Sequence, residues 1–236
     1  MMARLDGAFL DVGANTGLYT VLAASARNDC IVHAFEPYEP IIRVFEDNVL
    51  ANQIQDRVRL HEVALSDERG EVTLYLPDAS HGMLETSASL EPEWGDGPKS
   101  KIQIERIPLD DIELPKISLV KADIEGHEAT FLAGAMKMVQ KDRPIILIEI
   151  LHIANFEKLA QFLADSGYLD FRLRPDMAIQ SFYPAFDPQS WNHAFVPPEK
   201  LPFFMEVCEA SKLEVVTPLT LPEPEKKSFW ARLFGN

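Results

Sequence analysis

The sequence predicts an α/β fold in which a seven-stranded, mostly parallel sheet carries helices on both faces. Two observations support this prediction. Short apolar runs alternate with amphipathic segments along most of the 236 residues, an order typical of strands joined by helices over a parallel sheet. A glycine-containing turn also follows the first apolar run and leads into the first helical segment, as in doubly wound sheets that bind ligands at their strand ends.

The first three strands are expected in the apolar runs at residues 8–12, 30–35 and 57–65. A helix should begin after Gly17, and a second should begin at Pro40 because proline is tolerated in the first turn of a helix. This order predicts parallel strands with right-handed crossovers.

The pattern changes after the third strand. Apolar residues alternate with polar ones around residues 72–76 and 102–104, which predicts an inserted pair of strands with one face toward water. We place this insertion at about residues 66–108. Residues 77–100 are rich in Gly, Pro, Ser and acidic residues and are expected to form either a lid or a plain mobile excursion.

Strands and helices alternate again after the insertion. Strands are expected at residues 117–122, 144–150, 168–173 and 194–196. One helix should cover residues 131–139, and another should run from an Asn155 cap to Gly167. These elements place one domain at residues 1–216.

Residues 217–236 are predicted to form a Pro-rich linker and a short amphipathic tail. Phe229, Trp230, Leu233 and Phe234 would form one apolar face with basic residues beside it. Such a segment can lie on a membrane surface, dock on a protein partner or pack on its own domain.

The composition limits the classes of partner. The net charge of −15 and the pI near 4.8 disfavour a nucleic-acid substrate, because most of this surface would repel phosphates. Cys30 and Cys208 are expected to be buried free thiols, which fits a reducing compartment. With no apolar run long enough for a signal peptide or a membrane span, we expect a cytoplasmic protein, with the tail as a peripheral membrane contact.

The turn after the first strand reads Asp-Val-Gly-Ala-Asn-Thr-Gly over residues 11–17, and Glu36 ends the second strand. A carboxylate at that place lies beside the ribose of a ligand bound across the strand ends. Asn15 replaces the second glycine of a dinucleotide fingerprint, and Asp11 would repel a diphosphate. S-adenosylmethionine carries an ammonium and a sulfonium, so these acids favour it as the cofactor.

Further motifs follow this turn in order. They are A-F-E-P at residues 34–37, V-A-L-S-D at 63–67, L-D-D at 109–111, V-K-A-D-I-E-G-H-E at 120–128 and R-P-I-I-L-I-E-I at 143–150. Together with the turn, this set resembles the FkbM-type methyltransferase family from about residue 8 to about residue 200. Members usually have a segment before the first strand, so that segment is either absent here or lies upstream of residue 1.

The resemblance implies a class I methyltransferase (Rossmann-like) fold, whose last strand runs antiparallel, and S-adenosylmethionine as methyl donor. It also implies an acceptor hydroxyl on a sugar, a glycan or another natural product. Gly13, Asn15 and Gly17 would lie under the methionine part of the donor, Glu36 would bind its ribose, and residues 64–66 would line its adenine. The full set expected at the cofactor is Asp11, Gly13, Ala14, Asn15, Gly17, Glu36, Pro37, Ala64, Leu65 and Ser66.

Candidate catalytic residues follow the next two strands. Asp123 and Glu125 come after the strand at 117–122, while Glu149 ends the strand at 144–150 and precedes His152. Ligands bind outside the carboxyl ends of such strands, so these groups could position an acceptor hydroxyl and take its proton. Asp123 or Glu125 could instead cap the following helix, and His152 could be a surface or helix-start residue.

Three alternatives remain open at this point. The acids could hold a divalent metal such as Mg²⁺, although we do not favour this and assign no metal ligand. The turn could serve a dinucleotide-dependent oxidoreductase. The chain could also bind an adenosine-containing ligand without catalysing a reaction.

Overall fold

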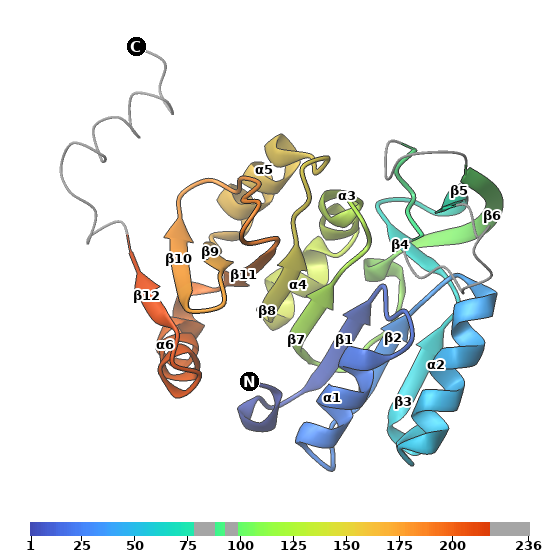
Figure 1. The fold of residues 1–236 in the computed structure, drawn as a ribbon, viewed down its shortest axis with the longest axis horizontal. Helices are drawn as coiled ribbons and strands as arrows, with labels where there is room; N and C mark the ends of the chain where they lie inside the picture. The colour runs from blue at the N-terminus through green and yellow to red at the C-terminus, as the bar shows by residue number, and fades with distance from the viewer. Residues whose placement is uncertain (78–87, 93–98, 218–236) are drawn as a thin grey trace.

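The computed structural model describes residues 1–77, 88–92 and 99–217 (Figure 1). Its described strands form one large mixed sheet and one small sheet. In spatial order, the large sheet consists of β12 (Glu214–Val216), β10 (Met177–Ser181), β9 (Leu169–Leu173), β11 (Asn192–Val196), β8 (Ile145–Glu149), β7 (Ile117–Ala122), β1 (Ala8–Val12), β2 (Val32–Phe35) and β3 (Val58–His61).

The strand directions place several strand ends together. Strands β3, β2, β1, β7 and β8 are parallel neighbours, whereas β11 is antiparallel to both β8 and β9. The carboxyl ends of β1, β2, β7 and β8 therefore share one edge of the sheet, where an α/β protein binds its ligands.

The expected count of seven strands is wrong, because the large sheet has nine strands among the described residues. The two additional strands, β10 and β12, extend one edge beyond β9. Both are short and only partly buried, so they depend on pairing with a neighbour more than on an apolar run of their own.

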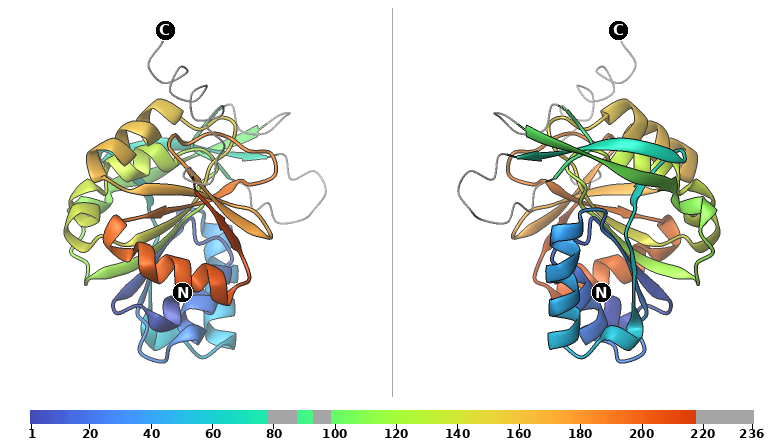
Figure 2. Two further views of the ribbon diagram at one scale, coloured as in Figure 1. Left: turned by 90° about the vertical axis from the view of Figure 1, so that its left-hand side faces the viewer. Right: turned by 90° about the vertical axis from the view of Figure 1, so that its right-hand side faces the viewer.

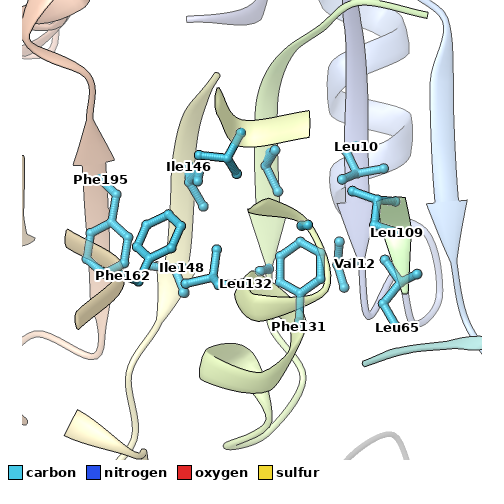
Figure 3. Packing of buried hydrophobic residues seen from close by; sticks show 14 of the residues in the cluster. Leu10, Val12, Leu65, Leu109, Phe131, Leu132, Ile146, Ile148, Phe162 and Phe195 are labelled. Atoms are coloured by element: carbon cyan, nitrogen blue, oxygen red, sulfur yellow. The ribbon is translucent and has the colours of Figure 1, made fainter. Parts of the chain in front are cut away.

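Helices cover both faces of the large sheet, as expected. They are α1 (Leu18–Ala26), α2 (Glu39–Ala51), α3 (Glu128–Ala133), α4 (Met136–Asp142), α5 (Phe156–Ser166) and α6 (Leu201–Ala210). Phe131 and Phe162, from α3 and α5, belong to one buried cluster (Figure 3). Phe45 and Phe204, from α2 and α6, belong to the cluster on the opposite face.

The sequence predicted the ends of α5 correctly but not the division between α3 and α4. Asn155 caps α5 by accepting a hydrogen bond from the Lys158 amide at 3.0 Å, and Gly167 ends the helix with a left-handed φ of 69°, both as expected. The helix expected at 131–139 is divided into α3 and α4 at Gly134. A Cβ on Gly134 would lie 1.9 Å from the Ser66 carbonyl, so the close approach of another strand requires glycine there. Helix α6 was not expected.

The small sheet has the order β4 (Ala64–Ser66), β6 (Lys99–Pro108) and β5 (Gly70–Pro77). Strands β5 and β6 pair antiparallel after β3, in the segment where we expected an insertion. The single strand expected at 57–65 is wrong, because the chain leaves the large sheet after His61 and enters the small one at Ala64. The side views place the small sheet at the same end of the molecule as α3 and α5 (Figure 2).

Four 3₁₀ turns complete the described elements, at Met2–Arg4, Gln55–Arg57, Leu109–Asp111 and Pro198–Lys200. Cys30 and Cys208 are buried free thiols, as expected. Within the part of the chain that the structure describes, no helix has the length and apolarity needed to cross a bilayer. The predicted tail at 218–236 and most of the predicted lid, at 78–87 and 93–98, lie outside the described residues.

Candidate functional site

A cavity of about 310 Å³ opens at the carboxyl ends of β1, β2 and β7 and reaches the small sheet. Nine residues expected at the site line it: Gly13, Ala14, Asn15, Glu36, Pro37, Ala64, Leu65, Asp123 and Glu125. Among the described lining residues there is no Lys, Arg or His. The charged side chains of the wall are therefore all carboxyls.

The turn after β1 is held tightly against its neighbours. The amides of Gly13 and Ala14 both donate to the Phe35 carbonyl, at 3.0 and 2.9 Å. Gly13 has a φ of 74°, and a Cβ on it would lie 2.1 Å from the carbonyl oxygen of Asp123. Only glycine fits where the ends of β1 and β7 approach this closely. The same turn thus joins the cofactor residues to the acids after β7.

Glu36 is buried at the end of β2 and faces this turn. Its Oε2 accepts a hydrogen bond from the Asn15 amide at 3.0 Å, and its Oε1 accepts one from the Tyr38 amide at 2.9 Å. Burial raises the pKa of Glu36, while these two amides lower it. Because a carboxylate has about four acceptor positions, each oxygen retains one for a ligand hydroxyl.

The rest of the cavity wall is mainly apolar. Phe35, Ile41, Val63, Leu74 and Leu90 all contribute to it. Such a wall suits a flat apolar group, and Glu36 can accept hydrogen bonds from neighbouring hydroxyls such as those of a ribose. Glu36, Asp123 and Glu125 on this wall would repel a diphosphate when ionised and attract a positively charged ligand.

Three residues expected at the cofactor do not line the cavity. Asp11 is buried on β1 and accepts a hydrogen bond of 2.6 Å from the Thr20 hydroxyl of α1, and burial raises its pKa to about 6. Side chains alternate along a strand, so Asp11 points to α1 although it lies close to the turn. Gly17 packs toward Phe45, and the Ser66 side chain is fully buried.

The acids after β7 and β8 lie close to one another beside the cavity, and we call Asp123, Glu125 and Glu149 the acid cluster. Asp123 and Glu125 line the cavity, whereas Glu149 is not among the lining residues but lies close enough for the charges of both to act on it. Burial, together with the charges of Asp123 and Glu125, raises the pKa of Glu149. Burial and the charges of Asp123 and Glu128 raise the pKa of Glu125 to about 7. Glu125 and Glu149 therefore tend to hold protons at neutral pH.

Lys121 joins this cluster from β7, and we did not single it out in the sequence. Its Nζ lies 2.9 Å from Oδ2 of Asp123 and 5.2 Å from the centroid of the Tyr19 ring. Lys121 is the one charged residue of the buried strand Ile117–Ala122. Its spacing of two residues from Asp123 places both side chains on one face of the sheet, which was the available signal.

The tight turn after Asp123 is stabilised by Glu128. Its Oε1 accepts hydrogen bonds from the amides of Ile124 and Gly126, at 3.1 and 3.2 Å. Burial raises the pKa of Glu128 to about 7. Glu128, and not Glu125, thus satisfies amides ahead of α3. Glu125 has a left-handed φ of 55° and faces the cavity.

Residues 88–92, from the segment expected to form either a lid or a mobile excursion, form another part of the site. Ala88 and Leu90 line the cavity, and the Ser89 hydroxyl donates to the Glu125 carbonyl at 2.7 Å. Glu91 contacts Nδ1 of His127 at 2.8 Å, and Nε2 of His127 lies 3.2 Å from the Ser66 hydroxyl. A chain of polar contacts thus ties this segment to β4 and to the start of α3.

His152 is not brought to the cavity wall. It is exposed, and its ring packs edge-on against Phe186 with 5.8 Å between the ring centroids. This agrees with the surface alternative and gives no support to a catalytic role. Among residues 1–77, 88–92 and 99–217, no group of three or more His, Cys, Asp or Glu side chains is arranged to hold a metal ion.

Comparisons with known proteins agree with this geometry. The sequence profile of the Methyltransferase FkbM domain matches residues 11–169, so the chain belongs to the FkbM methyltransferase family. The fold is similar to that of the methyltransferase FkbM from Methylobacillus flagellatus KT, with a TM-score of 0.55 and 16% sequence identity. That similarity covers 81% of this chain and 45% of the other.

One curated relative has a short region of similarity. The AMB antimetabolite synthetase AmbE of Pseudomonas aeruginosa is 41% identical over 76 residues, which are 32% of this chain. This chain spans only 4% of the length of AmbE. The family match and the fold together define the chain as a methyltransferase-family protein with a Rossmann-like fold.

Proposed function

We propose that this protein transfers a methyl group from S-adenosylmethionine to a hydroxyl of a sugar, a glycan or another natural product. The observation that carries the proposal is the cavity at the strand ends. Its described wall combines the buried Glu36 with Asp123 and Glu125 and contains no cationic side chain. A ligand with a ribose and positive charges suits this wall.

Each part of the donor has a matching part of the wall. The free acceptor positions of Glu36 suit the two ribose hydroxyls. The turn of residues 13–17 would lie under the methionine part, because Gly13 leaves the backbone open to close approach. Ala64 and Leu65, with the neighbouring apolar side chains, would border the adenine. When bound, S-adenosylmethionine supplies an activated methyl group on its sulfonium.

The acid cluster would act on the acceptor. An alkyl hydroxyl becomes a good nucleophile as its proton leaves, and a positioned base contributes about 10²–10⁴-fold. Asp123 lines the cavity and is half-buried, so we assign it the tasks of orienting the hydroxyl and accepting its proton. Glu149, which lies close to Asp123 in the acid cluster, would orient that carboxylate. Most of the remaining catalysis would come from alignment of the two substrates.

The acceptor is proposed to be a small molecule or a glycan. An acid-lined wall and a net charge of −15 favour a small molecule or a glycan over a nucleic acid. The partial similarity to a protein named as an antimetabolite synthetase is in keeping with a natural-product acceptor. A dinucleotide-dependent oxidoreductase is not favoured, because ionised carboxyls on the described wall would repel a diphosphate.

The proposal can be tested with metabolite and glycan extracts of the host lacking the gene. The purified protein is incubated with these extracts and S-adenosylmethionine carrying a deuterated methyl group, and products are examined by mass spectrometry. We expect a labelled methyl ether that is absent with the Asp123→Asn variant and present with the exposed control Glu157→Gln. Labelled products confined to nitrogen or carbon would contradict the assignment as an O-methyltransferase.

A further inference from the structure

Residues 88–92 join two parts of the cavity wall, and we call them the strap. On one side, the Tyr75 amide of β5 donates to the Ser89 carbonyl at 2.8 Å, and the Ser89 amide donates to the Tyr75 carbonyl at 3.1 Å. On the other side, the Ser89 hydroxyl donates to the Glu125 carbonyl at 2.7 Å. The strap therefore spans from the small sheet to the turn after β7.

Two side chains of the strap belong to the cavity wall. Ala88 and Leu90 are half-buried and line the cavity, as do Leu65 and Leu74 of the small sheet. Ser89, between them, is buried. This is the alternation of an extended segment that turns one face to the cavity and the other to the protein. The strap thus extends the apolar wall that borders the adenine in the proposed function.

Three side chains outside the cavity fix the strap, and we call Ser66, His127 and Glu91 the latch. Oε1 of Glu91 lies 2.8 Å from Nδ1 of His127, and Nε2 of His127 lies 3.2 Å from the Ser66 hydroxyl. A Cβ on Gly126 would lie 3.3 Å from Cγ of Glu91, so Glu91 also packs on the turn after β7. Both ring nitrogens of the buried His127 therefore hold the strap to β4 and to the start of α3.

The latch has the order serine, histidine and acid, which is also the order of a nucleophilic triad. Ser66 is fully buried, and no latch residue is among the described residues that line the cavity. A substrate in this cavity has no access to the Ser66 hydroxyl. The geometry therefore fits a positioning task and excludes nucleophilic catalysis by Ser66 on such a substrate.

We propose that His127 is a positioning residue that holds the strap against the bound donor, so that Leu90 covers the adenine and slows release of S-adenosylmethionine. The identity of the donor rests on the proposed function, whereas the attachment of the strap by the latch is a property of the protein alone. Breaking the latch leaves every lining side chain in the chain but loosens the strap. The donor should then bind more weakly, because the binding-competent form is less populated.

The first measurement is the rate of release of S-adenosylmethionine in a stopped-flow chase. His127→Ala and Glu91→Ala should each raise the dissociation rate constant about 10-fold, because each removes one partner of a hydrogen bond of the buried imidazole. Glu91→Gln keeps the acceptor oxygen and should retain the rate of the unmodified protein, which loss of the acceptor alone would not allow. Glu71→Ala, at an exposed residue of β5, is the matched control and should leave the rate unchanged.

The second measurement is hydrogen exchange of the Ser89 amide by NMR in the full chain without ligand. In Glu91→Ala this amide should exchange about 10-fold faster, while the amides of β7 keep their original exchange. Glu91 is partly exposed, so this variant should fold even if His127→Ala does not.

The outcomes separate the latch from the proposed function. If the unmodified protein binds no S-adenosylmethionine, the proposed function fails, and faster exchange at Ser89 still supports the attachment of the strap by the latch. Faster exchange at Ser89 with unchanged release of bound donor would overturn the covering of the donor by the strap. Unchanged exchange at Ser89 in Glu91→Ala, or equal acceleration at Ser89 and throughout β7, would overturn the latch.

Discussion

The two halves of the cavity are built in different ways. In the half after β1 and β2, Glu36 has a backbone amide on each of its oxygens. In the half after β7 and β8, the acid cluster lies beside a buried lysine, Lys121, whose Nζ is 2.9 Å from Oδ2 of Asp123. In the first half, backbone amides supply hydrogen bonds to the Glu36 carboxylate. In the second half, burial and neighbouring carboxyls raise the pKa of Glu125 and of Glu149.

This difference indicates that the first half recognises the donor and the second half takes part in proton transfer. A carboxylate with a fixed set of amide donors keeps one geometry, which suits the recognition of a ligand. Carboxyls that share protons are suited to accept one during a reaction. We therefore expect substitutions in the first half to change donor affinity and substitutions in the second half to change turnover.

The largest effect is expected in the half after β7 and β8. Asp123→Asn should lower turnover by about 10²–10⁴-fold, because it removes the positioned base, and Glu149→Ala should lower turnover less, because it removes only a side chain proposed to orient that base. Donor affinity should change much less. Single-turnover methylation and calorimetric titration, run on the same preparations with Glu157→Gln as control, separate the two quantities. Equal losses of donor affinity and turnover would contradict the separate functions of the two halves. Inhibition by a chelator would indicate that the acids bind a metal ion.

The next effect concerns the turn that joins the halves. Gly13→Ala should destabilise the fold by about 2–5 kcal/mol, from left-handed strain and from a Cβ only 2.1 Å from the Asp123 carbonyl. Gly167→Ala is the matched control, since Gly167 has a similar φ of 69° but open space around its Cα. Thermal unfolding should show a loss of about 1–2 kcal/mol for the control. Equal losses would show that the contact with Asp123 does not matter.

A smaller effect is expected at the proposed ribose contact. Glu36→Ala should weaken S-adenosylmethionine binding by about 10–100-fold, because charged hydrogen bonds contribute about 1.5–3 kcal/mol each. Glu39→Ala removes an exposed glutamate that is ion-paired with Arg43 and should leave affinity unchanged. Calorimetry on both variants decides, and an unaltered affinity in Glu36→Ala would exclude this residue as the ribose ligand.

The smallest effect tests the support beneath the acid cluster. The pKa of Glu128 is raised from 4.5 to about 7 in the fold, so the folded state holds this proton more tightly than the unfolded state. The stabilisation of the fold by the protonated Glu128 carboxyl is full below pH 4.5 and is lost as the pH rises through about 7. Glu128→Gln keeps the Oε1 acceptor without ionising, and should be more stable than the wild type at pH 8 by about 1–3 kcal/mol.

Urea unfolding of both proteins at pH 5 and pH 8 checks this prediction. The difference in unfolding free energy between variant and wild type should be much smaller at pH 5. If the difference is independent of pH, Glu128 is not protonated in the fold.

The sequence predicted the first half of the site better than the second. The turn at residues 11–17 and the acid at the end of β2 are local signals, since each depends on neighbours close in the chain. Glu36, Gly13 and Asn15 accordingly line the cavity. Asp11 was misplaced because a strand end does not by itself reveal which face a side chain takes.

The second half depends on contacts between distant segments. The Lys121 side chain contacts the Asp123 carboxylate and lies over the Tyr19 ring of α1, which is far from it in sequence. The contacts among Ser66, His127 and Glu91 join three separate parts of the chain. The edge strands β10 and β12 and the split at residues 62–63 likewise depend on pairing that no single stretch of sequence reveals.

The central claim is that this cavity binds S-adenosylmethionine and not a dinucleotide. Isothermal titration calorimetry of the full chain with S-adenosylmethionine and with NAD tests it most directly. The account predicts saturable binding of S-adenosylmethionine that weakens in Glu36→Ala, and no measurable binding of NAD. Saturable binding of NAD without binding of S-adenosylmethionine would contradict it.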